Sequence, residues 1–370
     1  MTHSWVGRVL ARGASRATEY VRSQRFLRRW VAAGYEAIMR YVRLAGTDLD
    51  VSTVALGCGN FGGIGSVPEL FGLGEDEAAA FALMDAAREH GITLFDTANT
   101  YGGGRSEEWI GRWLASRGTR DSVVLSTKVR NRVGPGPHAE GLSAHHIRTQ
   151  VEASLRRLGT DRIDLYLAHA PDPQVPIEET LGAFDELASA GKIRYSGLSN
   201  YTGAQVTDAV AAADRTGVVR PVNLQSGYSL LEPAAEALAA VTREGLSFTA
   251  HSPLAGGWLA GRYRASGEPY PRDSRMALRP DPYEHLVNDG TFAALDALRQ
   301  QATDRGVALP ALALAWVLND PAVDVVVVGP RRPDQLAPAL AALDLPLSPA
   351  ERTDLTRIMP SGPAEPAQPA

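Results

Sequence analysis

Four side chains that could together move a proton follow three successive β-rich runs of the sequence. Asp96 ends one run, and Tyr101 lies in the loop after it, beside the glycine run 102–104. Lys128 ends the next run, and His169 ends the one after that. Each alone has an ordinary structural interpretation, such as a helix cap for Asp96 or a satisfied buried imidazole for His169. If the runs are neighbouring parallel strands, their carboxyl ends meet and the four side chains converge.

The chemistry that such a set supports is protonation of a carbonyl oxygen. A free tyrosine has a pKa of about 10 and donates its proton poorly at neutral pH. A nearby ammonium lowers that pKa, and a buried ammonium needs a carboxylate partner. A neutral imidazole can orient a carbonyl oxygen and share in the proton transfer. We therefore expect Tyr101 to act as the acid, Lys128 to lower its pKa, Asp96 to hold Lys128, and His169 to orient the substrate.

Lysine usage singles out Lys128. The sequence contains two lysines, Lys128 and Lys192, among 37 basic residues, so arginine serves at the other 35 positions. Lysine differs from arginine in being a compact charge whose pKa shifts readily. Lys128 is therefore the position where we least expect arginine to be tolerated.

The pattern of the chain explains how these residues could be brought together. Eight β-rich runs each precede a helical pattern, and runs such as VVVV (325–328) are apolar on both faces, as in a sheet covered on both sides. This predicts an α/β fold, a (β/α)8 TIM barrel, with its active site at the carboxyl ends of the strands. The stretch 41–52, with a Gly-Thr-Asp turn at 46–48, predicts a β-hairpin before the first barrel strand.

Composition and charge limit the remaining possibilities. The chain has 370 residues, a net charge of −5 and a single cysteine, Cys58. These features favour neither nucleic acid nor a membrane as a partner, and they predict a reducing, cytoplasmic setting. We expect a domain at 39–355, with a Pro/Ala-rich disordered tail at 356–370. The segment 1–38, with seven arginines against two acids, is expected to lie outside the fold, although a surface helix or a transit peptide are alternatives.

Competing motifs are weak. Gly57, Gly59 and Gly62 match the G-x-G-x-x-G dinucleotide pattern, but no helix pattern opens at these glycines, so we predict a loop. No metal site is expected, because His145 and His146 are adjacent on a predicted helix and the H-E-x-x-H motif is absent. A Ser-His-Asp hydrolase is disfavoured because there is no G-x-S-x-G elbow.

The chain resembles the aldo-keto reductase family from about Arg40 to Leu355. The resemblance is carried by these stretches: FDTANTYGGGRSEEWIGRWL, LSTKV, SLRRLGTDRIDLYLAHAPD, GKIRYSGLSNY, HSPLAGGWLAGRY and VVVVGPRRPDQL. It implies that the family's catalytic tetrad falls on Asp96, Tyr101, Lys128 and His169. The stretch that begins at Met39 also resembles the usual start of proteins in this family.

The resemblance further implies NADPH (NADP+) bound in extended form at the barrel mouth without a Rossmann fold. By position, Ser199, Asn200 and Gln225 would hold the carboxamide, while the pyrophosphate would lie along Ser252, Pro253 and Leu254. The adenosine phosphates would meet Gly329, Arg331, Arg332 and Gln335. A guanidinium suits a 2′-phosphate because it binds phosphate in a fork. A basic helix start at the surface is the alternative interpretation of the two arginines.

Three features depart from the family pattern. His251 stands where the family usually stacks an aromatic side chain on the nicotinamide. A charged imidazole there would repel the oxidised cofactor, so we hypothesise that its affinity falls below about pH 6.5. Pro338 and Ala339 replace a Glu-Asn pair near the adenine, which weakens that contact. The loop 258–286, which shapes the family's substrate pocket, contains arginines compatible with an acidic or sugar-like substrate.

The sequence thus predicts an NADPH-dependent oxidoreductase that reduces an aldehyde or ketone, a small-molecule carbonyl substrate. Two alternatives stay open. One is a cofactor-binding regulatory module that resembles channel β subunits, with the basic segment 1–38 as its partner arm. The other is a lyase or epimerase that uses the cofactor internally. The oligomeric state is not predicted.

Overall fold

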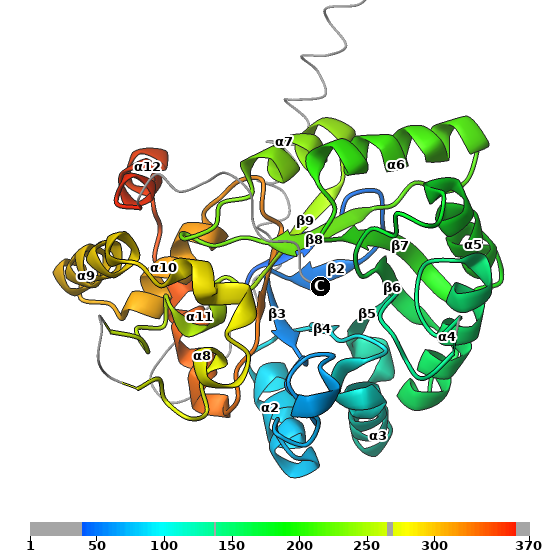
Figure 1. Cartoon of the computed structure of the whole chain (residues 1–370), viewed down its shortest axis with the longest axis horizontal. Coiled ribbons are helices and arrows are strands. Elements are labelled where there is room, and N and C mark those ends of the chain that lie inside the picture. The colour runs from blue at the N-terminus through cyan, green and yellow to red at the C-terminus, as the bar shows by residue number, and fades with distance from the viewer. Residues whose placement is uncertain (1–38, 137, 265–268, 360–370) are drawn as a thin grey trace, which may run out of the picture.

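A closed barrel of eight parallel strands forms the centre of the molecule (Figure 1). The computed structural model describes residues 39–136, 138–264 and 269–359. Neighbouring strands follow one another in chain order, and the last strand closes the barrel by pairing with the first. The barrel strands are β3 Val54–Gly57, β4 Leu94–Asp96, β5 Val124–Val129, β6 Ile163–Ala168, β7 Ile193–Ser199, β8 Asn223–Gly227, β9 Ser247–His251 and β10 Val325–Val328. The predicted (β/α)8 barrel is confirmed.

Helices surround the strands, with α2 to α7 following the barrel round and α8 to α12 gathered on the left of the view (Figure 1). Their apolar faces pack on the outside of the barrel in one large buried cluster. The α-helices of the described residues are α2 Glu77–Glu89, α3 Arg105–Arg117, α4 Ala144–Leu158, α5 Ile177–Ser189, α6 Gly203–Thr216, α7 Ala235–Glu244, α8 Arg275–Leu278, α9 Asp289–Asp304, α10 Leu309–Leu318, α11 Ala337–Leu343 and α12 Pro349–Arg357.

Helix ends follow the local sequence signals. The side chain of Ser143 accepts a hydrogen bond from the His146 amide at the start of α4, and Gly159 ends that helix in the left-handed conformation. Asp76 caps α2 in the same way as Ser143 caps α4. Helix α2 therefore begins at Glu77, directly after this cap. Gly57, Gly59 and Gly62 are followed by a loop and not by a helix. They therefore do not form a dinucleotide-binding turn, as predicted.

The predicted β-hairpin covers the amino-terminal end of the barrel. Strands β1 Tyr41–Arg43 and β2 Asp50–Ser52 pair antiparallel, and Gly46 adopts φ +72° in the turn. The Ala45 amide donates to the side chain of Ser247 at 2.7 Å, which fixes the turn to β9. Apolar side chains of the hairpin and the barrel strands share a buried cluster of Leu44, Leu49, Val51, Leu94, Leu165, Val222 and Val325. The hairpin is thus a plug for this end of the barrel.

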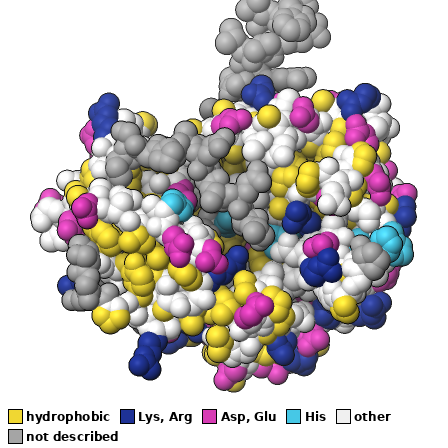
Figure 2. Space-filling model, viewed as in Figure 1, with side chains coloured by type: hydrophobic (Ala, Val, Ile, Leu, Met, Phe, Trp, Pro, Cys, Tyr) yellow, Lys and Arg dark blue, Asp and Glu magenta, His cyan; other side chains and the backbone are white. Residues whose placement is uncertain are grey.

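The two chain ends are only partly described. Residues 1–38 and 360–370 lie outside the described residues, so the predicted extension stays a prediction. Helix α12 runs to Arg357, which makes the first two residues of the expected disordered tail helical instead. On the face seen in Figure 2, Lys and Arg side chains are interspersed with Asp and Glu side chains, in keeping with a modest net charge.

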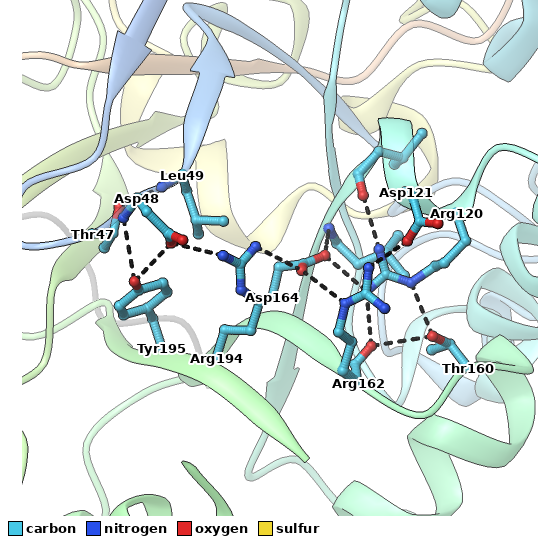
Figure 3. A network of polar contacts seen from close by, with 12 residues as sticks. Thr47, Asp48, Leu49, Arg120, Asp121, Thr160, Arg162, Asp164, Arg194 and Tyr195 are labelled. Carbon is cyan, nitrogen blue, oxygen red and sulfur yellow. Dashed lines mark hydrogen bonds and ion pairs between the residues drawn. The ribbon is translucent and has the colours of Figure 1, made fainter. Parts of the chain in front are cut away.

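A charge network ties the hairpin turn to the amino-terminal ends of the strands (Figure 3). Its centre is Asp164 on β6, whose side chain is 3% exposed. Three arginine side chains approach this carboxylate: Arg120 at 2.9 Å, Arg194 at 3.5 Å and Arg162 at 3.9 Å. The Leu125 amide of β5 donates to it as well, at 2.9 Å. These charges stabilise the fold at the amino-terminal end of the barrel, while the residues predicted to be catalytic lie at the carboxyl end.

Replacing Asp164 by Asn should destabilise the fold. The change leaves three arginines without their shared buried counter-charge, and breaking a buried pair in this way costs about 3 kcal/mol. Urea unfolding would measure it, with Asp161→Asn as the control. Asp161 is 88% exposed and should change the free energy of unfolding by no more than about 0.5 kcal/mol. Equal stability of the two variants would contradict this view of the network.

Candidate active site

A buried ion pair between Asp96 and Lys128 lies at the carboxyl end of the barrel. The Lys128 ammonium donates to Asp96 Oδ2 at 2.6 Å and to the Thr97 carbonyl at 2.9 Å. Lys128 is 1% exposed and Asp96 is 4% exposed. The residues come from the adjacent parallel strands β4 and β5, which explains how side chains 32 positions apart meet.

Tyr101 and His169 complete the group. The Lys128 ammonium lies 5.2 Å from the centre of the Tyr101 ring. The His169 ring meets the Tyr101 ring edge-on, with 5.8 Å between the ring centres. The structure therefore brings together all four residues that were predicted to converge.

The loop that carries Tyr101 is held against β5 by its backbone. The Thr97 and Asn99 amides donate to the carbonyls of Ser126 and Lys128, at 2.8 and 3.1 Å. Beyond them the glycine run 102–104 adopts positive φ throughout, and a Cβ at Gly102 would lie 2.3 Å from the Phe61 carbonyl oxygen. The glycines thus allow close packing of two loops.

The electrostatics differ in one respect from the expectation. Burial raises the pKa of Tyr101 above its usual value, and the charge of Lys128 opposes that rise without reversing it. Burial acts to lower the pKa of Lys128, but Asp96 and Tyr101 outweigh it and leave that pKa raised. Tyr101 is therefore a protonated phenol beside a stable ammonium. Lys128 can stabilise the phenolate that forms when the proton leaves, because opposite charges attract strongly where water is excluded.

His169 is a neutral hydrogen-bonding group. Burial lowers the pKa of its imidazole well below the usual value, and the positive charge of Lys128 adds to this effect. The Asn131 side-chain nitrogen lies 3.4 Å from His169 Nδ1. Because an amide nitrogen can only donate, Nδ1 accepts and the proton is on Nε2. His169 can therefore donate one hydrogen bond from Nε2.

Gln225 has a hydrogen-bond partner within the chain. Its side-chain nitrogen donates to Asp96 Oδ1 at 2.8 Å, and Ser126 donates to the same oxygen at 2.9 Å. Gln225 thus helps to fix the carboxylate that holds Lys128. Sequence reasoning missed Ser126, although it lies two residues before Lys128 on β5 and so shares its face of the strand.

The side chains after β7 and β9 are joined by hydrogen bonds. Asn200 donates to the His169 carbonyl at 2.9 Å and to Ser199 at 3.1 Å. Its side-chain oxygen lies 2.8 Å from His251 Nε2, and Ser252 Oγ lies 3.1 Å from His251 Nδ1. Burial lowers the pKa of His251 to about 4, and Lys128 contributes to the shift. This lowered pKa moves the expected loss of affinity for the oxidised cofactor to a pH below 6.5.

Unusual backbone conformations gather at this end of the barrel. Asn200, Ser252 and Ala255 are non-glycine residues with φ between +45° and +59°. Such conformations are costly and concentrate at functional sites. Ser252 is exposed, Leu254 is half-buried and Pro253 is buried, so this loop presents a hydroxyl group and backbone at the barrel mouth.

The predicted phosphate-binding residues lie in the loop after β10. Gly329, Arg332 and Gln335 are exposed, and the Gln335 side-chain oxygen accepts from the Arg331 amide at 2.7 Å. Arg332 lies 3.2 Å from Asp334 in an exposed ion pair. Arg331 instead points to Glu75 of the loop after β3, at 2.6 Å. Both arginines therefore have a carboxylate of this chain beside them.

Arg275 is a further cation at this end of the barrel. It begins α8 and donates to the Asn60 side chain at 2.7 Å. Its positive charge acts to lower the pKa of Tyr101. Sequence reasoning placed it only within the loop 258–286, and no local pattern marks one arginine of that loop above the others.

Comparison of the sequence with known proteins identifies the family of this chain. The model of the Aldo/keto reductase family matches residues 55–359. The chain belongs to the aldo/keto reductase family. It is 38% identical over 321 residues to the uncharacterized oxidoreductase YrpG of Bacillus subtilis, covering 84% of this chain and 92% of that protein. It is also 35% identical over 338 residues to a probable voltage-gated potassium channel subunit beta of Arabidopsis thaliana, covering 89% and 99%.

A relative with a named substrate is more distant. L-glyceraldehyde 3-phosphate reductase of Escherichia coli is 31% identical over 274 residues, covering 71% of this chain and 78% of that protein. The aldo/keto reductase family generally works with NAD(P)H. The arginines 275, 331 and 332, the Ser252 hydroxyl and the exposed backbone at Gly329 form a donor set suited to the phosphates of such a cofactor. Among the described residues, each helix is too short or too polar to cross a membrane.

The neutral state of His251 can be tested directly. We expect NMR of the imidazole nitrogens to show a neutral ring at pH 5.5, because burial has lowered the pKa to about 4. An assignment through His251→Gln would identify the signal. A ring that is mostly charged at pH 5.5 would contradict the burial effect described here.

Proposed function

We propose that this aldo/keto reductase is an NADPH-dependent carbonyl reductase that converts an aldehyde or ketone, sugar-like ones included, into an alcohol. The observation that carries the proposal is the buried Asp96–Lys128 pair beside Tyr101 and His169. When bound, the nicotinamide cofactor supplies hydride to the carbonyl carbon. The free cysteine Cys58 is buried and agrees with a cytoplasmic setting.

Each of the four residues then has one task. His169 donates from Nε2 to the carbonyl oxygen and orients it. Tyr101 is protonated at neutral pH and donates its phenolic proton to that oxygen, since burial keeps the pKa of the phenol high. Lys128 stabilises the phenolate that remains, and Asp96 holds Lys128 in place with Ser126 and Gln225 on its other oxygen.

Cofactor contacts follow from the same end of the barrel. Ser199, Asn200 and His251 would line the carboxamide and ring, and Gln225 would contribute less than first expected because its amide nitrogen already donates to Asp96. Ser252, Pro253 and Leu254 would meet the pyrophosphate. Gly329, Arg331, Arg332 and Gln335 would surround the adenosine end. Pro338 and the buried Ala339 in the first turn of α11 offer the adenine no amide or carboxylate.

A regulatory role is the second candidate, favoured by the likeness to a channel β subunit over nearly the whole length of that relative. Steady consumption of NADPH with a panel of aldehydes, ketones and phosphorylated sugars, with NADH in parallel, separates the two. Turnover supports the reductase. Cofactor binding without turnover of any carbonyl supports the regulatory module.

Replacing Tyr101 by Phe should lower kcat by about 10²- to 10⁴-fold, because it removes only the acidic hydroxyl. NADPH binding, followed by quenching of tryptophan fluorescence, should stay unchanged. Tyr195→Phe is the control, since this tyrosine donates to Asp48 of the hairpin turn at the opposite end of the barrel. A Tyr101→Phe variant with the turnover of the unaltered protein would refute the assignment of the acid.

A further inference from the structure

Arg331 is held by three segments of the chain at once. Its Nε donates to Glu75 Oε1 at 2.6 Å, Nη1 to the Asp273 carbonyl at 3.1 Å and Nη2 to the Leu73 carbonyl at 3.4 Å. The loops after β3, β9 and β10 therefore meet on one guanidinium. Arg331 therefore connects these loops to one another, besides being available to an incoming anion.

Glu75 is unusual for a residue in a surface loop. Its side chain is 4% exposed, and Oε2 is buried without a hydrogen-bond partner. The backbone is fixed on both sides, because the Glu75 amide donates to the Asn60 carbonyl and the Gly62 amide donates to the Glu75 carbonyl. These bonds fix the position of the Glu75 backbone, and the carboxylate is held by its contact with Arg331. It depends on Arg331, since a buried charge without its partner is strongly unfavourable.

The position of this pair matters for the cofactor. The following step rests on the proposed function, in which the loop after β10 receives the adenosine end of the nicotinamide cofactor. A 2′-phosphate that approaches Arg331 meets the Glu75 carboxylate on the same guanidinium. Two anions that share one cation repel each other, and moving Glu75 aside would break its buried contact with Arg331. Arg332, the remaining arginine of the loop, already lies beside Asp334.

We propose that Glu75 is a specificity-determining residue that limits the preference of this protein for a 2′-phosphorylated cofactor. With Glu75 on Arg331, the positive charge that this arginine offers to a 2′-phosphate is partly neutralised. The affinity for the non-phosphorylated cofactor is unaffected, because that cofactor has no 2′-phosphate to meet Arg331. The protein therefore accepts NADH alongside NADPH, with a margin in favour of NADPH that Glu75 keeps small.

The test compares two fragments that differ by the 2′-phosphate, 2′,5′-ADP and 5′-AMP, by calorimetric titration of the full chain. The unaltered protein should prefer 2′,5′-ADP by less than about tenfold. Glu75→Gln keeps the size of the side chain and removes its charge, so it should strengthen 2′,5′-ADP binding by about tenfold and leave 5′-AMP within about twofold. Glu69→Gln is the matched control, because Glu69 is an exposed acid of the same loop and should change neither affinity.

The gain must come through Arg331. In the double variant Glu75→Gln/Arg331→Met the strengthened 2′,5′-ADP binding should disappear. If Glu75→Gln does not fold, as judged by thermal unfolding, Glu75→Met with Arg331 intact serves the same comparison. Unchanged or weaker 2′,5′-ADP binding in the folded variant, or an equal gain for both fragments, would overturn the proposal.

Two binding results separate the role of Glu75 from the cofactor site itself. If NADPH and NADH both bind the unaltered protein and Glu75→Gln leaves the preference between the fragments as it was, only the role of Glu75 is wrong. If neither dinucleotide binds, the cofactor site itself is wrong, and the role assigned to Glu75 falls with it.

Discussion

The ion pair between Asp96 and Lys128 is the interaction on which the rest of the site depends. It places a full positive charge in the interior of the barrel mouth, where water does not screen it. Burial and that charge together keep His169 neutral, and the charge opposes the rise in the pKa of Tyr101 that burial causes. Ser126 and Gln225 hold the carboxylate from two further directions, which makes the pair rigid.

The two ends of the barrel have different roles: residues at one end stabilise the fold, and residues at the other form the candidate active site. At the amino-terminal end, the hairpin covers the barrel, and the arginines around Asp164 form ion pairs with its carboxylate. At the carboxyl end, strained backbone at Asn200 and Ser252 and the cations Arg275 and Arg331 leave an arrangement suited to an anionic ligand. Parallel strands impose this division, because all their carboxyl ends lie on the same side.

Much of this could be predicted from sequence, because strand periodicity and the end of each run fix which side chains share the barrel mouth. The barrel, the hairpin and the meeting of Asp96 with Lys128 follow from that pattern alone. The partners of Gln225 and Arg331 do not, because each depends on a residue more than 100 positions away. The low pKa of His251 was missed for a related reason, since burial in the folded chain sets it.

The central claim is that the Lys128 charge acts on the Tyr101 phenol. Tyrosine labelled with ¹³C at Cζ reports ionisation of each ring by NMR, and the signal lost in Tyr101→Phe identifies Tyr101. Its pKa should be higher in Lys128→Met than in the unaltered protein, because the ammonium that stabilises the phenolate is lost and the charge of Asp96 is left unopposed. A Tyr101 pKa that is unchanged or lower in Lys128→Met would contradict the account.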